Sequence, residues 1–179
     1  MPQRTELYDR HVQAGAKIVD FAGWEMPIHY GSQVQEHHQV RNAAGVFDVS
    51  HMVVVDIDGK DAKAFLQYLL ANDVAKLKES GKALYSTMLN AEGGIVDDLI
   101  VYYLDENSYR LVVNAGTRDK DLAWLEAQKA AYAVDLKVRD DLSILAIQGP
   151  DAIKIVQSLL SESDQKMVDD LGVFYGVDV

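Results

Sequence analysis

The chain has 179 residues, which is enough for one large domain or two small ones. Asp and Glu number 28 against 17 Lys and Arg, and the formal net charge of −11 argues against a nucleic-acid or membrane-surface binder, because both need a basic surface. The sequence contains no cysteine, which excludes disulfides, thiolate catalysis and cysteine-ligated zinc or iron–sulfur centres within the chain.

The N-terminal segment has neither the apolar core of a signal peptide nor an Arg-rich presequence, and no apolar run reaches the length of a membrane span. We therefore expect a cytoplasmic protein. Apolar periodicity and turn residues predict the remaining elements. Helices are predicted at 5–11, 32–45, 61–70, 116–131, 151–160 and 163–171. Strands are predicted at 16–21, 46–52, 53–58, 83–89, 95–103, 109–114, 134–138, 142–148 and 172–179.

Most of these strands follow one another as hairpins instead of alternating singly with helices. This order predicts an α+β fold with antiparallel sheets and flanking helices. Residues 23–27 are expected to form a loop, and Ser32 is expected to cap a surface helix. The apolar segment 172–179 stops without a polar tail, so we expect a chain cut short from a longer protein.

Two adjacent acids, Asp97 and Asp98, open an apolar strand directly after a glycine-containing turn. Side chains alternate along a strand, so the two carboxylates must face opposite sides of the sheet and cannot share a proton with each other. One of them is expected to point outward or toward backbone donors, and the other into a site. The alternative is that both simply cap the turn.

The predicted hairpins bring Tyr85, Asp98, Tyr102 and Asn114 into neighbouring positions of one sheet. Aromatic rings, a carboxylate and a carboxamide suit a flat heterocycle with several N–H donors, such as a pterin. A core containing two hydrogen-bonded tyrosines explains the same residues, and the pattern leaves both interpretations open. The five histidines show no chelating spacing, so we expect no metal site.

Four segments together resemble the aminomethyltransferases, the T-proteins of the glycine cleavage system. They are KIVDFAGWEMP at 17–27, VFDVSHM at 46–52, GGIVDDL at 93–99 and QGP at 148–150. The resemblance implies a tetrahydrofolate-binding fold with tetrahydrofolate as co-substrate. It also implies transfer of a methylene group from the aminomethyl-lipoyl arm of the H-protein to tetrahydrofolate, with release of ammonia.

The resemblance also assigns site residues. The second acid of the family's GGxxDD motif, Asp98 here, is expected to be the catalytic carboxylate and to contact folate. Asp97 becomes the structural acid. The positions expected to line the folate pocket are Met52, Tyr85, Asp98, Tyr102, Asn114 and a terminal aromatic residue, Phe174 or Tyr175, with Phe174 preferred.

The expected domains are 1–51 as the first part of the folate-binding domain, 52–140 as a ferredoxin-like α+β domain, and 141–179 as a truncated return to the first. The expected partners are lipoylated H-protein and folate, with no nucleic acid or membrane, and the full-length protein is expected to be a monomer. Family members continue into a Gly-Tyr-Thr-Gly-Glu segment, a substrate-binding Glu and Arg, and a barrel-like domain. This chain contains none of these, so we expect it to be weakly active or inactive alone. The competing functions are a folate-binding module without transfer activity and a folate-dependent demethylase acting on a sulfonium substrate.

Overall fold

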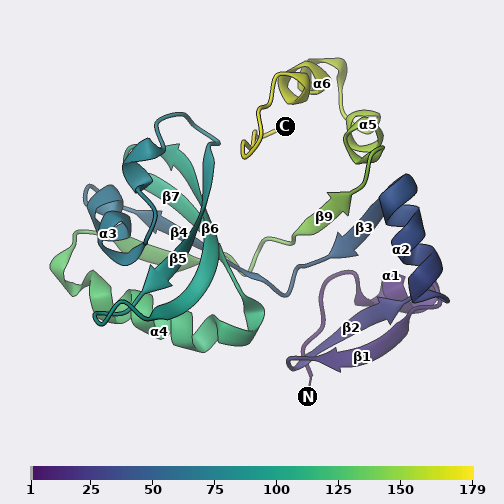
Figure 1. Cartoon of the computed structure of the whole chain (residues 1–179), viewed down its shortest axis with the longest axis horizontal. Coiled ribbons are helices and arrows are strands. Elements are labelled where there is room, and N and C mark those ends of the chain that lie inside the picture. Colours follow the sequence, from purple (N-terminus) through teal and green to yellow (C-terminus); the bar gives the residue numbers. More distant parts are fainter. Residues whose placement is uncertain (1) are drawn as a thin grey trace. The chain divides into compact units, whose positions relative to one another are not determined.

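The computed structural model describes residues 2–179, which form two compact units (Figure 1). Unit 1 contains residues 2–51 and 142–168, and unit 2 contains Met52–Asp141 and Asp169–Val179. The last eleven residues therefore group with unit 2, whereas the sequence placed them in the first domain. Backbone hydrogen bonds explain the difference, because Ala83 N–H donates to the Phe174 carbonyl and Gly176 N–H to the Gly81 carbonyl, at 2.7 and 2.9 Å.

Unit 1 combines two small antiparallel sheets with short helices. Its elements are α1 (Tyr8–Gln13), β1 (Lys17–Phe21), β2 (Trp24–His29), α2 (Gln33–Asn42), β3 (Gly45–Asp48), β9 (Leu145–Gln148), α5 (Ala152–Gln157) and α6 (Glu162–Asp169), the last of which ends one residue beyond the unit boundary. Strand β1 pairs with β2, and β3 pairs with β9 across a long sequence separation. Ser32 caps α2 as predicted, since its hydroxyl oxygen accepts a hydrogen bond from Gln35 N–H at 3.3 Å.

The expected loop at 23–27 is wrong, because most of these residues lie in strand β2. Ala22 and Gly23 both have positive φ angles, 52° and 85°, and together close a tight turn between β1 and β2. The sequence pattern did not predict this hairpin because Ala is an uncommon residue at a turn position with a positive φ angle. Pro27 is compatible with a strand at the edge of a two-stranded sheet.

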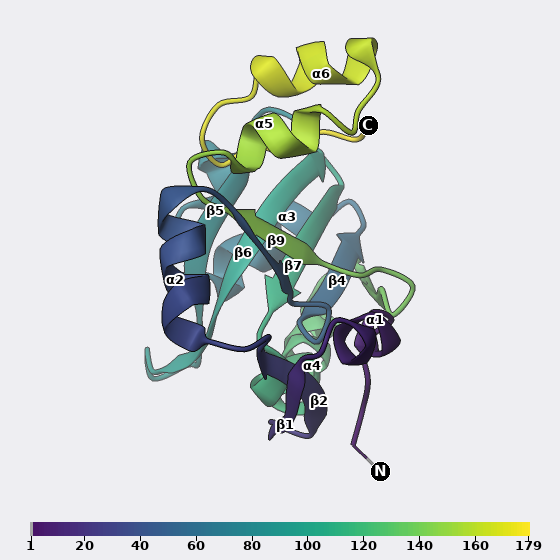
Figure 2. The same cartoon turned by 90° about the vertical axis from the view of Figure 1, so that its right-hand side faces the viewer.

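Unit 2 is built on one five-stranded antiparallel sheet in the order β5-β6-β7-β4-β8 (Figures 1 and 2). Its strands are β4 (Val53–Asp58), β5 (Ala83–Leu89), β6 (Ile95–Asp105), β7 (Ser108–Val113) and β8 (Asp135–Val138). Its helices are α3 (Ala62–Leu69), α4 (Arg118–Gln128) and short 3-10 turns at Val74–Lys76, Ala115–Thr117 and Lys129–Ala131. Antiparallel sheets with flanking helices confirm the α+β prediction. Without β5, the order β6-β7-β4-β8 is a split β-α-β arrangement.

Helices α3 and α4 both pack on one face of this sheet and form the core. The residues buried there include Phe65 and Leu66 of α3, Leu125 of α4, and Val55 and Val101 of the sheet, all with no exposed surface. We call the opposite face the front face.

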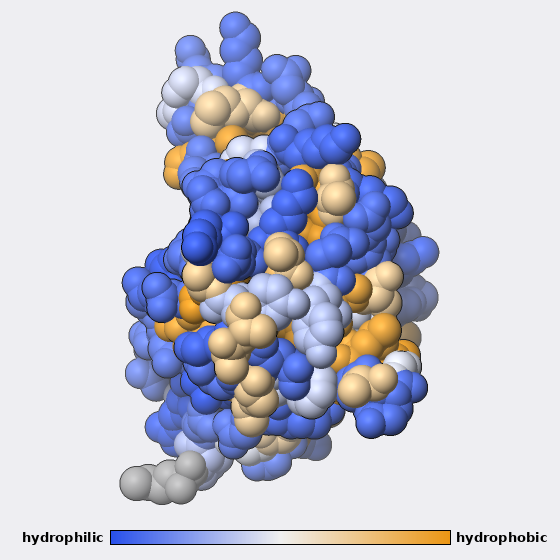
Figure 3. All heavy atoms as spheres, turned by 90° about the vertical axis from the view of Figure 1, so that its left-hand side faces the viewer, coloured by the Kyte–Doolittle hydropathy of each residue, from blue (hydrophilic) through white to orange (hydrophobic). Residues whose placement is uncertain are grey.

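One side of the molecule, drawn as spheres in Figure 3, is mostly hydrophilic with small separate apolar groups. Among residues 2–179, no helix is both long and apolar enough to span a bilayer.

The predicted strand at 172–179 is also wrong. Tyr175 forms an isolated bridge with Lys82, and the segment otherwise runs as irregular chain beside β5. Phe174 has a φ angle of 61°, which is incompatible with an extended strand. Apolar composition alone therefore suggested a strand where the local backbone turns.

Candidate functional site

The strand register defines three successive rows of side chains on the front face of unit 2. Written from β5 toward β4, the rows are Thr87, Asp98, Asn114 and Met52; then Tyr85, Ile100, Val112 and Val54; then Ala83, Tyr102, Arg110 and Asp56. Asn114 and Met52 lie directly beyond the ends of β7 and β4. A polar row, a mainly apolar row and a charged row thus follow one another across the same face.

Asp98 is at the centre of the polar row and has two side-chain partners. The Tyr85 hydroxyl donates to its Oδ2 at 2.7 Å, and the Asn114 amide lies 3.4 Å from its Oδ1 and 3.2 Å from its backbone carbonyl. The hydrogen bond to Asp98 raises the pKa of Tyr85, so this phenol keeps its proton and acts as a donor. The structure therefore brings together Tyr85, Asp98 and Asn114, as the sequence placed them.

Asp97 points to the other side of β6, as strand alternation predicts. Its carboxylate accepts hydrogen bonds from the Thr117 hydroxyl at 2.7 Å and from the Asn114 amide at 3.1 and 3.2 Å. Burial acts to raise the pKa of Asp97, but hydrogen bonds from Asp121, Thr117 and Asn114 together hold it below its usual value. The neighbouring acids thus occupy separate environments, and Asn114 contacts both.

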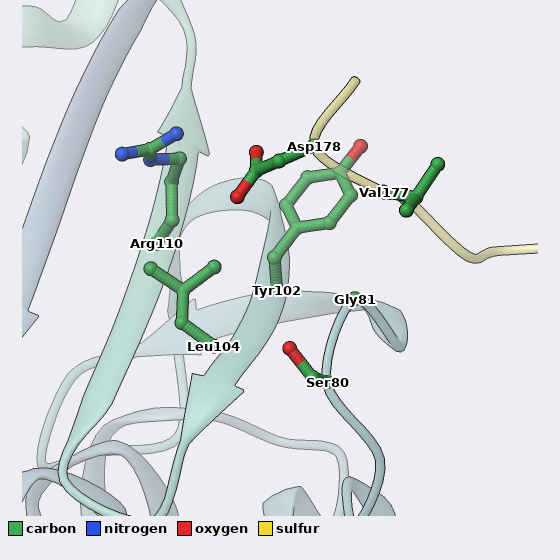
Figure 4. Close-up of a pocket in the computed structure, with 8 residues that line it drawn as sticks. Ser80, Gly81, Tyr102, Leu104, Arg110, Val177 and Asp178 are labelled. Atoms are coloured by element: carbon green, nitrogen blue, oxygen red, sulfur yellow. The ribbon is translucent and has the colours of Figure 1, made fainter. Parts of the chain in front are cut away.

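A cavity of about 510 Å³ borders the third row (Figure 4). Tyr102 reaches into it beside the C-terminal segment that carries Asp178, whereas Arg110 lines it from the neighbouring strand with its guanidinium turned away from that segment. The remaining lining comes from Ser80, Gly81, Leu104, Gly176 and Val177. Tyr102 therefore shares a face with Asp98 and also lines a cavity.

Arg110 is held in place by an ion-pair cluster that the sequence did not reveal. Its guanidinium donates to Asp56 at 2.7 and 3.0 Å, and Arg139 donates to the same carboxylate at 2.6 Å. Arg139 also pairs with Asp141 at 2.8 Å. Burial acts to raise the pKa of Asp56, yet the two guanidinium groups lower it overall, so Asp56 stays ionised. Finding this cluster requires the register of β4 against β7, which strand periodicity does not supply.

Met52 and Phe174 are less closely associated with Asp98. Met52 is half-buried at the Asn114 end of the first row. Phe174 is 53% exposed and is not part of the cavity lining, although its carbonyl anchors the C-terminal segment to Ala83. The other candidate aromatic, Tyr175, donates its hydroxyl to Glu79 at 2.9 Å.

Asp121 was also missed from the sequence. It lies in α4 with no exposed surface, one helical turn before the buried Leu125. The i, i+4 spacing to Leu125 is a signal that could have identified it as an inward-facing acid.

Among residues 2–179, no three His, Asp or Glu side chains are grouped so that they could hold a metal ion.

Comparisons with known proteins agree with this architecture. A model of the GCVT N-terminal domain family matches residues 7–173. The chain is similar to the crystal structure of glycine cleavage system aminomethyltransferase T from Bartonella henselae, with 36% sequence identity and a TM-score of 0.86 over 98% of this chain. It spans 47% of that chain's length. The protein therefore belongs to the GCVT N-terminal domain family and has the aminomethyltransferase T-protein type of fold.

Proposed function

We propose that the front face of unit 2 binds tetrahydrofolate and that Asp98 is the catalytic carboxylate of aminomethyl transfer. The observation that carries the proposal is the placement of Asp98. It is an acid on the front face beside a mainly apolar row, hydrogen-bonded by Tyr85 and Asn114, and separated from Asp97 by strand alternation. The relative from Bartonella henselae, an aminomethyltransferase, supports the reaction class.

The residues present fit a reduced pterin. Ile100 and Val112 form an apolar strip beside Asp98, which suits the flat ring of the ligand. Asp98 accepts hydrogen bonds from ring N–H groups, and Tyr85 can donate to a ring oxygen or nitrogen. Because Asn114 is held through its amide nitrogen, its carboxamide oxygen can accept another ligand N–H. Met52, Tyr102 and Phe174 remain proposed contacts of the same ligand.

The proposed reaction needs a carboxylate at this position. The methylene carbon of the aminomethyl-lipoyl group exchanges its bonds to sulfur and nitrogen for bonds to N5 and N10 of tetrahydrofolate. The two folate N–H hydrogens leave as protons, one ending on the lipoyl thiol and one on ammonia. Asp98 stabilises the positive charge that develops on the attacking nitrogen and relays a proton from it. Lipoylated H-protein is the proposed donor.

Calorimetry with tetrahydrofolate under reducing conditions tests the proposed binding face. We expect Asp98→Asn to lower the affinity of the chain at least about tenfold, because one charge-assisted hydrogen bond contributes about 1.5–3 kcal/mol. Glu92→Gln removes one negative charge from the exposed turn before β6 and should leave binding unchanged. Equal affinity of Asp98→Asn and the parent chain would contradict the assignment.

The alternative of a folate-binding module without transfer activity predicts a different outcome. Because the chain alone is expected to be weakly active or inactive, the assay uses a version extended by the C-terminal half of the family. Incubation of this version with aminomethyl-lipoyl H-protein and tetrahydrofolate should yield ammonia and methylenetetrahydrofolate if the protein is an aminomethyltransferase, at a rate that Asp98→Asn reduces. Folate binding without product favours the module. Turnover of a methylsulfonium donor instead of the lipoyl donor identifies the folate-dependent demethylase.

A further inference from the structure

Asp121 is a buried acid for which the proposed reaction has no direct use. It has no exposed surface, and neither carboxyl oxygen receives a hydrogen bond of ordinary geometry from residues 2–179. An isolated carboxylate in such a place costs several kcal/mol, so burial favours the neutral acid. Asp97 and Thr117 interact with it by hydrogen bonding, and Lys120 interacts with it through its charge.

The hydrogen between Asp97 and Asp121 must come from Asp121. The Thr117 hydroxyl, 2.7 Å from Asp97 and 3.2 Å from the Asn114 carbonyl, has a single hydrogen and cannot serve Asp97 and Asp121 together. A hydrogen bond between the two carboxyl groups therefore requires that one of the acids is protonated. Asp97 is the acid that stays ionised, because Thr117 and Asn114 already stabilise its negative charge. A protonated Asp121 completes this set as a further donor to Asp97.

We propose that Asp121 is a positioning residue that holds a proton in weakly acidic solution and, by donating it to Asp97, keeps the Asn114 carboxamide against Asp98. The Asn114 nitrogen carries two hydrogens, and the structure directs them toward Asp97 and toward Asp98. A single negative charge on Asp97 therefore orients the residue that contacts the candidate catalytic acid. The link to catalysis rests on the proposed function, whereas the proton itself does not.

The surroundings of Asp121 bring its loss of a proton into a pH range in which the folded chain can be studied. Burial, followed by the hydrogen bond with Asp97, raises the pKa of Asp121 to about 7, while Thr117 and the cation Lys120 act in the opposite direction. Lys120 donates to the backbone carbonyl of Val96 and so remains close to the start of β6. Above this pH, Asp97 and Asp121 are both negative and repel each other, and the hold on Asn114 weakens.

Side-chain amide NMR tests the proposal without any ligand. In the ¹⁵N-labelled chain, the Asn114 NH₂ signal, assigned by its loss in Asn114→Ser, should shift with a midpoint near pH 7. Asp121→Asn still offers an N–H to Asp97 but has no proton to lose, so its Asn114 signal should not respond. Asp119→Asn, which removes an exposed acid from the first turn of the same helix, should titrate like the parent chain. A pH-independent Asn114 signal in the parent chain, or the same titration in Asp121→Asn, overturns the proposal.

Tetrahydrofolate affinity supplies the functional measurement. We expect the parent chain to bind about tenfold more weakly at about pH 8 than at about pH 6, and Asp121→Asn to bind equally at both. Asp121→Leu, which cannot donate a hydrogen bond, should bind tetrahydrofolate weakly at both pH values. If Asp121→Leu does not fold, the comparison of Asp121→Asn with the parent chain tests the positioning role. Equal pH dependence in the parent chain and Asp121→Asn contradicts the positioning role. If the parent chain binds no tetrahydrofolate at any pH, the proposed function fails, while the Asn114 titration still decides where the proton resides.

Discussion

Replacement of Asp56 by asparagine tests whether the ion-pair cluster behind the cavity stabilises unit 2. Asp56 is 7% exposed and accepts three hydrogen bonds from Arg110 and Arg139. The substitution retains the shape of the side chain but removes its charge, leaving two guanidinium groups close together. Removing one partner from a buried ion pair costs about 3–5 kcal/mol, and the partial exposure of both arginines moves our expectation to about 3 kcal/mol.

Urea unfolding followed by tryptophan fluorescence measures this loss. The chain has two tryptophans, so a Trp24→Phe background leaves Trp124 of α4 as a reporter of unit 2 alone. With a slope of about 2 kcal/mol per molar urea, the midpoint should fall by about 1.5 M. Asp58→Asn is the matched control, since Asp58 lies two residues further along β4, is exposed, and is bonded by Ser108.

The pH dependence of the stability difference between the parent chain and Asp56→Asn gives an independent check. The folded pKa of Asp56 lies below its unfolded value, so its contribution is present above about pH 4 and is lost as the pH falls through the folded pKa. The parent chain and Asp56→Asn should therefore converge in acid. Adding Arg110→Met to Asp56→Asn should recover part of the stability, because it removes one unpaired charge. A midpoint within about 0.3 M of the parent at neutral pH would refute the reasoning.

Two further substitutions test the packing of each unit. His11→Ala removes the group that hydrogen-bonds the buried Asp48 at 2.9 Å, and we expect unit 1 to lose about 2 kcal/mol. Urea unfolding in a Trp124→Phe background, with Trp24 as the reporter of unit 1, measures this loss, and an unchanged midpoint contradicts it. Gly81→Ala places a Cβ 1.9 Å from the Gly176 carbonyl oxygen at a φ of +82°, so the C-terminal segment should detach and exchange its amide hydrogens faster. Unchanged hydrogen exchange at 174–178 would show that the segment adapts.

The sequence was most informative where a single strand or helix decides the outcome. Alternation along β6 separated Asp97 from Asp98, and the structure confirms that they face opposite sides of the strand, with Thr117 bonded to Asp97 and Tyr85 to Asp98. The cap at Ser32 needed only four consecutive residues. The order of strands and helices was sufficient to predict the fold class, because hairpins show themselves as short apolar runs joined by turn residues.

Features that depend on long-range register could not be predicted in this way. Asp56 meets Arg110 only because β4 lies beside β7, 54 residues later in the chain. The pairing of β3 with β9 and the return of residues 169–179 to unit 2 likewise depend on contacts between distant segments. Local periodicity specifies which side chains share a face of one strand, but not which strand is its neighbour.

The contrast between Asp97 and Asp98 follows from their neighbours more than from their own chemistry. On the core side, Thr117 at the start of α4 and the buried Asp121 within it hold Asp97 by protein donors, so it has no need of a ligand. On the front face, Asp98 has one phenol and one shared amide, which leaves acceptor capacity for an incoming molecule. Two identical residues thus have different environments, and the roles that we propose for them rest on this difference, as do the roles of paired acids in enzymes. Asn114 is the contact through which the protonation of the core-side pair can reach the front-face acid.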